Sequence, residues 1–263
     1  MSVRRLYGKH AHECPSSDDL RHIAGFQKGG SGSSAIEIMR HVVDAASDGW
    51  RLLVSQRTRL LNALRGHLTE VGVIAAQGPR HGRELAELIE ACDEIIPFEV
   101  CEALAPLVVQ LRNLDEAIAR LDRIIAELAQ KDETARRLMS IPGFGPITAS
   151  AMAATIQDTS SFAGPREFAA FLGLTPKQNS SGGKQKLGRI SKMGNRNLRK
   201  LLVVGAHAVL FHRKPHTDPL RMWAKRLLEK KPFKLVAVAL ANKMARIAFA
   251  ILRGKTVYRE IPT

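Results

Sequence analysis

The feature that most constrains the fold of this chain is a run of leucine and isoleucine residues spaced three and four positions apart. Its members are Leu104, Leu107, Leu111, Leu114, Ile118, Leu121, Ile125 and Leu128. This spacing places all eight side chains on one face of a helix over more than three heptads, which is the pattern of a coiled-coil seam. We expect Pro106 to lie near the start of that helix, where its missing N–H is harmless.

Two further helices are predicted before this seam. The first has its apolar face at Leu61, Leu64, Leu68 and Val71 and ends near Gly72, and the second at Leu85, Leu88, Cys92 and Ile95 before Pro97. Helices this amphipathic are not stable alone, so they must pack as an antiparallel hairpin or on a second copy of the chain. We expect a homo-oligomer, although burial of the seam within one chain agrees equally well with the pattern.

Positive charge is concentrated in the C-terminal third of the chain. The formal net charge is +15, and the segment from Lys177 onward holds 21 basic and 3 acidic residues. A basic tract confined to one region favours a nucleic-acid partner. We expect no membrane partner, because the longest apolar stretch, residues 235–241, is far shorter than the roughly 20 residues needed for a crossing.

Cysteine usage indicates a reducing compartment, the cytoplasm. The three cysteines form no CxxC pair, so neither a disulfide framework nor a zinc ribbon is predicted. His10, His12 and Cys14 alternate, but no second ligand pair follows them, and we assign no metal ligand.

The segment from Leu174 to Lys200, LTPKQNSSGGKQKLGRISKMGNRNLRK, combines serines, paired glycines and unopposed positive charge. Its cations are Lys177, Lys184, Lys186, Arg189, Lys192, Arg196, Arg199 and Lys200. No acidic residue interrupts them, so we expect the segment to bind DNA or RNA where Ser180 and Ser181 are presented. The glycines would let a phosphate approach the backbone closely. The alternative is a disordered Gly/Ser linker.

The motif Pro-Gly-Phe-Gly-Pro within residues 137–157 predicts a helix-hairpin-helix unit. Pro146 is suited to the first position of the second helix, which would run to Ile156. Backbone N–H groups near Gly143 and Gly145 could then hold a DNA phosphate without reading sequence. An ordinary tight turn in a helical bundle would give the same pattern.

Four helices are expected to complete the chain. After a short apolar helix at residues 168–172, helices are predicted at 195–212, 219–230 and 232–253, the last ending at Gly254 and forming the core. Arg196, Arg199 and Lys200 would lie in the first turn of the helix from Asn195. Cations there oppose the helix dipole at a cost of a few tenths to about 1 kcal/mol unless an anion is bound.

The predicted fold is therefore mainly α: a long coiled-coil helical hairpin followed by a compact helical domain that contains the helix-hairpin-helix unit. We divide the chain into a poorly ordered segment at 1–48 with one short helix near residues 35–46, coiled-coil helices at 49–131, and a domain at 132–263.

Two stretches, IPGFGPITAS and FAAFLGLTPKQNSSGGKQKLGRISKMGNRNLRKLL, resemble the C-terminal domain of the IS110 family (DEDD class) of bacterial insertion-sequence transposases. SQRTRLLNALRGHLTEVG resembles the preceding helix, so the similarity covers about residues 50–263. It implies a bacterial cytoplasmic enzyme of DNA transposition and recombination. Its partners would be element ends, target DNA and a structured guide RNA. The catalytic serine of the family falls on Ser181, with Ser180 the less favoured neighbour.

The resemblance also implies an N-terminal RuvC-like domain whose four carboxylates bind divalent metal, Mg²⁺. Residues 1–48 show no apolar strand and no such carboxylate spacing, so this chain is expected to lack that domain and its cofactor. The function expected is DNA strand exchange by a serine nucleophile. The alternatives are a truncated, non-catalytic nucleic-acid-binding and inhibitory remnant, and a helical scaffold with a basic face.

Overall fold

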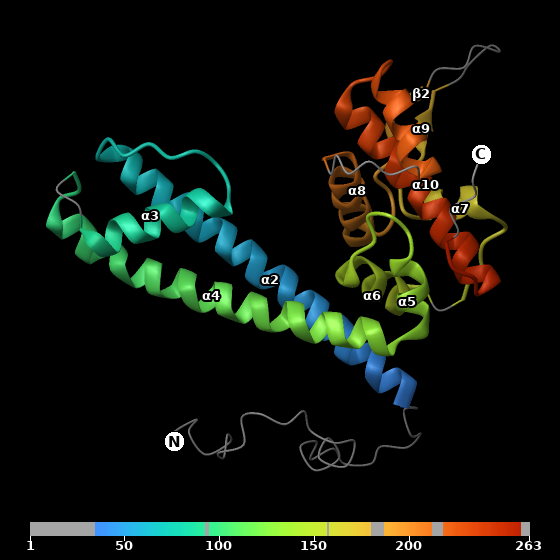
Figure 1. Ribbon diagram of the computed structural model, residues 1–263, viewed down its shortest axis with the longest axis horizontal. Coiled ribbons are helices and arrows are strands. Elements are labelled where there is room, and N and C mark those ends of the chain that lie inside the picture. The colour runs from blue at the N-terminus through green and yellow to red at the C-terminus, as the bar shows by residue number, and fades with distance from the viewer. Residues whose placement is uncertain (1–34, 93–94, 157, 180–186, 212–217, 259–263) are drawn as a thin grey trace. The chain divides into compact units, whose positions relative to one another are not determined.

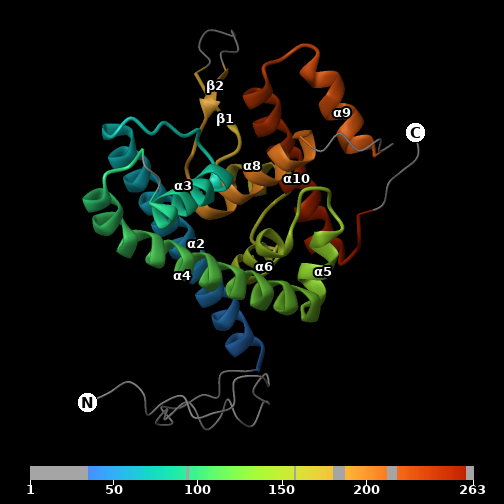
Figure 2. The ribbon, with the colours of Figure 1, turned by 60° about the vertical axis from the view of Figure 1, so that its left-hand side comes forward.

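The computed structural model describes residues 35–92, 95–156, 158–179, 187–211 and 218–258 (Figures 1 and 2). Met39–Thr263 form one compact unit and Met1–Ile38 another, of which only the start of a helix belongs to the described part. The mainly helical fold predicted from the sequence is confirmed.

Three helices form the first part of the large unit: α2 (Ala35–Glu70), α3 (Pro79–Ala91) and α4 (Phe98–Lys131). Their shared apolar cluster contains Leu64 and Leu68 of α2, Leu85 of α3, and Leu104 and Leu111 of α4. The helix predicted to end near Gly72 does so, and Gly72 has a φ of 86°. An ion pair of 3.1 Å between Arg57 Nη1 and Asp115 Oδ1 also joins α2 to α4.

The start of α2 differs from the prediction. We expected irregular structure up to residue 48 with one short helix, but α2 runs without a break from Ala35 across residue 48 to Glu70. Gly49 and Gly66 each cost about 1 kcal/mol relative to alanine in a helix, yet no proline interrupts the stretch. The short apolar phase read at residues 35–46 is therefore the beginning of the long helix.

The predicted seam lies on the inner face of α4. Leu104, Leu111, Leu114, Ile118 and Ile125 are buried within the single chain, whereas its other members, Leu107, Leu121 and Leu128, are half-buried. Pro106 does not lie near the helix start as predicted, because α4 begins eight residues earlier at Phe98. Proline leaves one backbone carbonyl without its helical partner. Here that carbonyl belongs to the exposed Glu102, where water can reach it.

The helix-hairpin-helix segment consists of α5 (Glu133–Met139) and α6 (Pro146–Thr155). Asp132 caps α5 by accepting a hydrogen bond of 2.8 Å from the backbone N–H of Thr134. Pro146 is the first residue of α6, as predicted. Both helices pack against α4, which connects this hairpin to the first part of the unit.

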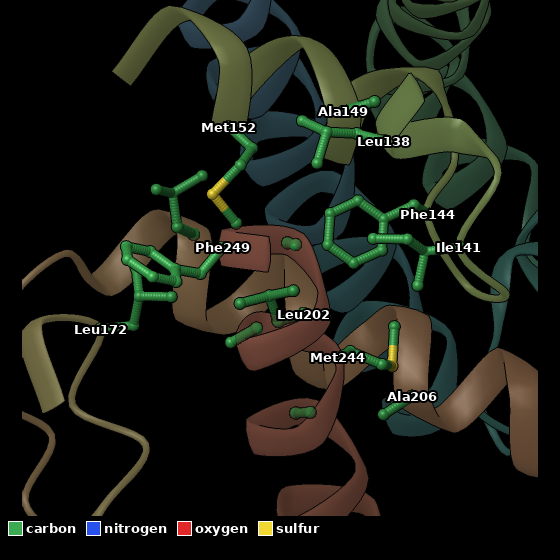
Figure 3. Close-up of a cluster of buried hydrophobic side chains, with 14 of the residues drawn as sticks. Leu138, Ile141, Phe144, Ala149, Met152, Leu172, Leu202, Ala206, Met244 and Phe249 are labelled. Atoms are coloured by element: carbon green, nitrogen blue, oxygen red, sulfur yellow. The ribbon is translucent and has the colours of Figure 1, made fainter. Parts of the chain in front are cut away.

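The second core is built around α10 (Phe233–Gly254), which contacts α5, α7 (Pro165–Phe171), α8 (Arg196–Phe211) and α9 (Pro219–Leu228). Figure 3 shows Phe144, Leu202 and Met244 converging between these helices. The predicted helices at these positions are present. The expected stop at Gly254 is displaced by one residue, because Lys255 has the positive φ of 49°.

By length and composition α10 could also cross a membrane, which the sequence argument from residues 235–241 did not foresee. It has 22 residues, and its most apolar window has a mean hydropathy of 1.8. Half of that window is buried inside the structure, and the buried side chains contact the surrounding helices. This burial explains the apolar composition, since α10 is the core helix of the unit.

A two-stranded antiparallel hairpin was not predicted. Strand β1 (Pro176–Gln178) pairs with β2 (Leu187–Ile190), with Pro176 opposite Ile190 and Gln178 opposite Leu187, and the register shifts between these two pairs. Both strands lie in the Leu174–Lys200 segment, for which the sequence analysis predicted no strand.

Candidate nucleic-acid interface

The hairpin carries the predicted catalytic segment between its strands. Ser181, its neighbour Ser180, and the predicted phosphate contacts Lys184 and Lys186 lie outside the described residues. The flanking strands are described, and exposed Lys177 and Arg189 lie on β1 and β2 respectively. The description of the site therefore concerns the base of the hairpin and the surface beside it.

Backbone hydrogen bonds close the base of the hairpin, and a side chain of α10 joins this base to the helical core. The N–H of Ser191 donates to the carbonyl of Thr175 at 2.8 Å, and the N–H of Lys192 to the carbonyl of Gly173 at 3.2 Å. Asn242 Nδ2 of α10 donates to the carbonyl of Leu174 at 3.2 Å. These bonds determine where the hairpin leaves the core.

Two glycines allow the chain to cross itself at this base. Gly173 and Gly194 have φ values of 68° and 91°. A Cβ on Gly194 would lie 1.8 Å from the carbonyl oxygen of Phe171, and one on Gly173 would lie 2.1 Å from that of Met193. No side chain fits either position without moving backbone.

A groove of about 1320 Å³ lies beside the hairpin and is formed by β2, α9 and α10. Its apolar surface includes Leu174, Leu235, Val238 and Ile247. Its basic residues are Arg189, Lys192, Lys234, Lys243 and Arg246, and no acidic residue is among the described residues that line it.

Lys243 is a half-buried cation of the groove. Its Nζ lies 4.3 Å from the centroid of the Trp223 ring, a cation–π contact. Burial lowers the pKa of Lys243, and the charges of Arg226 and Arg246 lower it further, against a smaller opposing effect of Asp218. Positive charge is thus crowded at this end of the groove, and a bound anion would relieve the repulsion.

The structure brings together only some of the residues predicted to bind nucleic acid. Arg189 and Lys192 line the groove, whereas Arg196 and Lys200 are exposed on α8 and do not line it. Arg199 is half-buried, and its Nη1 donates to the carbonyl of Leu172 at 2.9 Å, and more weakly to that of Met193 at 3.4 Å. Arg199 therefore holds the backbone together at the hairpin base.

The start of α8 is capped by a side chain, which changes the argument for a phosphate there. Asn195 Oδ1 accepts hydrogen bonds of 3.0 Å from the N–H groups of Asn197 and Leu198. This cap satisfies two of the free N–H groups, and Arg199 turns toward carbonyl groups. Unfavourable charge at this helix end is thus no longer an independent reason to expect an anion, and a phosphate at this position stays a prediction.

The two glycines of the helix-hairpin-helix differ in their surroundings. A Cβ on Gly143 would lie 2.7 Å from the carbonyl oxygen of Gly205 in α8 and 2.8 Å from Met244 Cε. Gly145, by contrast, is exposed, and a Cβ there would meet nothing within 4 Å. Gly143 is therefore a packing residue, and only the turn at Gly145 is open to a ligand.

Four groove residues were missed by the sequence analysis: Trp223, Lys234, Lys243 and Arg246. A signal was present, because Lys234, Val238, Asn242 and Arg246 recur every four residues and share one face of α10. The apolar composition of that helix led us to assign all of it to the core.

The described residues contain no group of three or more His, Cys, Asp or Glu side chains that could hold a metal ion. No metal ligand is therefore assigned among them.

Comparison with known proteins identifies the class of this domain. Residues 135–220 match the family model described as "Transposase IS116/IS110/IS902 family". That stretch contains α6, α7, the β-hairpin and α8. Residues 135–220 therefore belong to this family of transposases.

Several curated relatives are transposases of bacterial insertion sequences. The chain is 44% identical over 212 residues to a "Probable family 20 transposase" of Pseudomonas aeruginosa, which covers 79% of this chain and 62% of the relative. It is 40% identical over 208 residues to "Transposase for insertion sequence element IS1111A" of Coxiella burnetii, covering 79% and 57%. A "Pilin gene-inverting protein" of Moraxella bovis is 30% identical over 149 residues, covering 54% and 45%. The chain thus spans about three fifths of the length of the first two relatives.

Proposed function

We propose that this chain acts in DNA strand exchange of an insertion sequence, with Ser181 as the nucleophile. The observation that carries the proposal is the position of the basic groove beside the hairpin whose strands flank the Ser181 segment. The base of that hairpin is also braced by Arg199 and Asn242. A hairpin fixed at its base would position the serine, and the unneutralised cations beside it would bind the negatively charged sugar-phosphate chain.

The proposed reaction is a transesterification. Ser181 Oγ attacks a phosphorus atom of DNA, an Oγ–P bond forms, and the bond from phosphorus to one deoxyribose oxygen breaks. The hydroxyl proton passes to a base and the leaving oxygen accepts a proton. A DNA hydroxyl then attacks the protein–DNA phosphoester and releases the serine. Lys177 and Arg189 on the strands would stabilise the negative charge that develops on the phosphorane.

The proposed partners are element-end DNA, target DNA and a structured guide RNA. In this proposal residues 132–263 contact DNA, and residues 49–131 contribute to a homo-oligomer through the half-buried seam positions of α4. The proposed location is the bacterial cytoplasm. No step is assigned to a metal ion in this chain.

Ser181→Ala tests the chemistry, with Ser180→Ala as the matched control. The full chain is incubated with labelled element-end DNA and guide RNA, and covalent protein–DNA adducts and joined strands are resolved on denaturing gels. We expect Ser180→Ala to form both products, and Ser181→Ala to form neither while binding DNA as tightly as the wild type. Adduct formation by Ser181→Ala would contradict the assignment. Binding without any joining by the wild type or either variant would instead assign a binding role.

A further inference from the structure

The groove beside the hairpin has an apolar surface and a basic surface, and one ligand would contact both. Its interior is formed by aliphatic side chains of α10 and the preceding turns, including Leu235, Val238 and Ile247. Leu235 is 52% exposed, and Val238 and Ile247 on the same helix are half-buried, so a continuous apolar surface lines the groove. An exposed apolar surface of this kind indicates a binding site.

The cations around this surface are not neutralised by the protein. Among the described residues, none of Arg189, Lys192, Lys234, Lys243 and Arg246 has a carboxylate oxygen within 4.0 Å. They come from β2, the segment that follows it, and α10, so they border the groove from two sides. A ligand with repeated negative charge complements this arrangement.

Duplex DNA does not match both surfaces. A duplex presents phosphates outward and keeps the faces of its bases stacked inside, so it would contact the cations and leave the aliphatic surface bare. A single strand can turn its bases toward an apolar surface while its phosphates meet the cations. Trp223 adds one aromatic ring to the wall, although Lys243 lies over it.

We infer that the groove formed by β2, α9 and α10 binds a single-stranded segment of DNA, with bases against Leu235 and Val238 and phosphates at Lys234 and Arg246. This inference rests on the proposed function in that DNA is the substrate. It adds that an unpaired strand is held beside the Ser181 segment, where strand exchange would separate one strand from its complement.

Fluorescence anisotropy with the full chain tests this assignment. The probes are one labelled single-stranded oligodeoxynucleotide, the same strand annealed to its complement, and RNA of the same sequence. The groove variant is Lys234→Ala with Arg246→Ala. Its control is Lys225→Ala with Lys231→Ala, which removes the same charge from exposed positions that do not line the groove.

We expect the groove pair to weaken single-strand binding roughly tenfold or more. The slope of log affinity against log salt should fall by about 1.4, since each lost phosphate contact on a single strand removes about 0.7. The control pair should leave the slope unchanged. Leu235→Ser should weaken single-strand binding at an unchanged slope, because it removes an apolar contact, and should leave duplex binding unaffected.

Three results would overturn the inference: equal losses for the groove and control pairs, equal losses for duplex and single strand, or groove-dependent binding of RNA as tight as that of DNA. Binding to vesicles of anionic phospholipid that depends on Lys234 and Leu235, without single-strand binding, would assign the groove to lipid instead. If the wild type binds duplex DNA and the groove variants change nothing, only this inference fails. If the wild type binds no form of DNA at low salt, the proposed function fails with it.

Discussion

At the residue scale, the hairpin depends on single atoms at its base. Gly194 and Gly173 lie so close to backbone carbonyl oxygens that neither position has room for a Cβ. Arg199 donates hydrogen bonds to the carbonyls of Leu172 and Met193, one on each side of the crossing. In the sequence these residues lie in a cationic stretch that contains glycines, and we interpreted its cations as phosphate contacts. The sequence could not show that Arg199 has a structural role and Arg196 does not, because hydrogen bonds to carbonyls distant in the chain leave no pattern in the sequence.

Gly194→Ala is expected to destabilise the fold by about 2–4 kcal/mol, because a Cβ at positive φ would collide with the carbonyl of Phe171. Urea denaturation followed by circular dichroism measures the change. Gly164→Ala is the control, since a Cβ there meets nothing within 4 Å and the backbone is extended; it should shift stability by less than about 1 kcal/mol. Equal effects of the two changes would show that the crossing is not tight.

Arg199→Met is expected to lower the free energy of unfolding by about 1–3 kcal/mol, since two carbonyls lose a charged hydrogen-bond donor. Arg196→Met, three residues earlier and exposed, should stay within about 0.5 kcal/mol of the wild type. Thermal denaturation of both variants is sufficient. A stability loss confined to Arg196→Met would reverse the assignment of the two arginines.

At the scale of elements, helices were predicted well and their packing was not. Steps of three and four residues correctly predicted α3 and α4, because helical periodicity is a property of neighbouring residues. The Pro-Gly-Phe-Gly-Pro motif correctly predicted the helix pair around Pro146. The same pattern gave no account of how the α5–α6 turn docks on α8 through Gly143 and Gly205. The β-hairpin was also missed, since its strands have only three and four residues and show no regular alternation of apolar and polar side chains.

Gly205→Ala tests the contact between the α5–α6 turn and α8, because the sign of its effect on the free energy of unfolding depends on that contact. In an open helix, glycine to alanine stabilises by roughly 0.5–1 kcal/mol. Gly66→Ala in α2, where a Cβ meets nothing within 4 Å, should do so. At Gly205 a Cβ would lie 2.2 Å from the carbonyl oxygen of Gly143, so we expect a loss of about 1–3 kcal/mol instead. A gain at Gly205 measured by urea denaturation would mean that the turn and α8 are not in contact.

At the scale of the whole molecule, the excess of positive charge from Lys177 onward becomes a surface property only after folding. Some of these cations, such as Arg199, bond to the protein's own carbonyls. Others gather around one groove, namely Arg189, Lys192, Lys234, Lys243 and Arg246. Composition therefore predicted the class of partner, whereas folding determined which cations are available to it.

This distribution predicts a steep salt dependence for binding of element DNA. With six to ten phosphates contacted, affinity should fall by roughly 10³ to 10⁵ between 50 and 200 mM salt. Filter binding or anisotropy across that range measures it. A flat response would contradict every nucleic-acid role considered for this chain.

The sequence by itself determined the helices, the concentration of charge in the C-terminal third, and a motif order typical of one transposase family. Each of these depends on residue type and on spacing within a short segment. Only the tertiary structure decided that Arg199 and Gly143 serve packing, and that one face of the core helix α10 forms a basic groove with β2 and α9. The reason is physical: a groove exists only where segments distant in the chain meet, and the side chains that border it are selected by that packing.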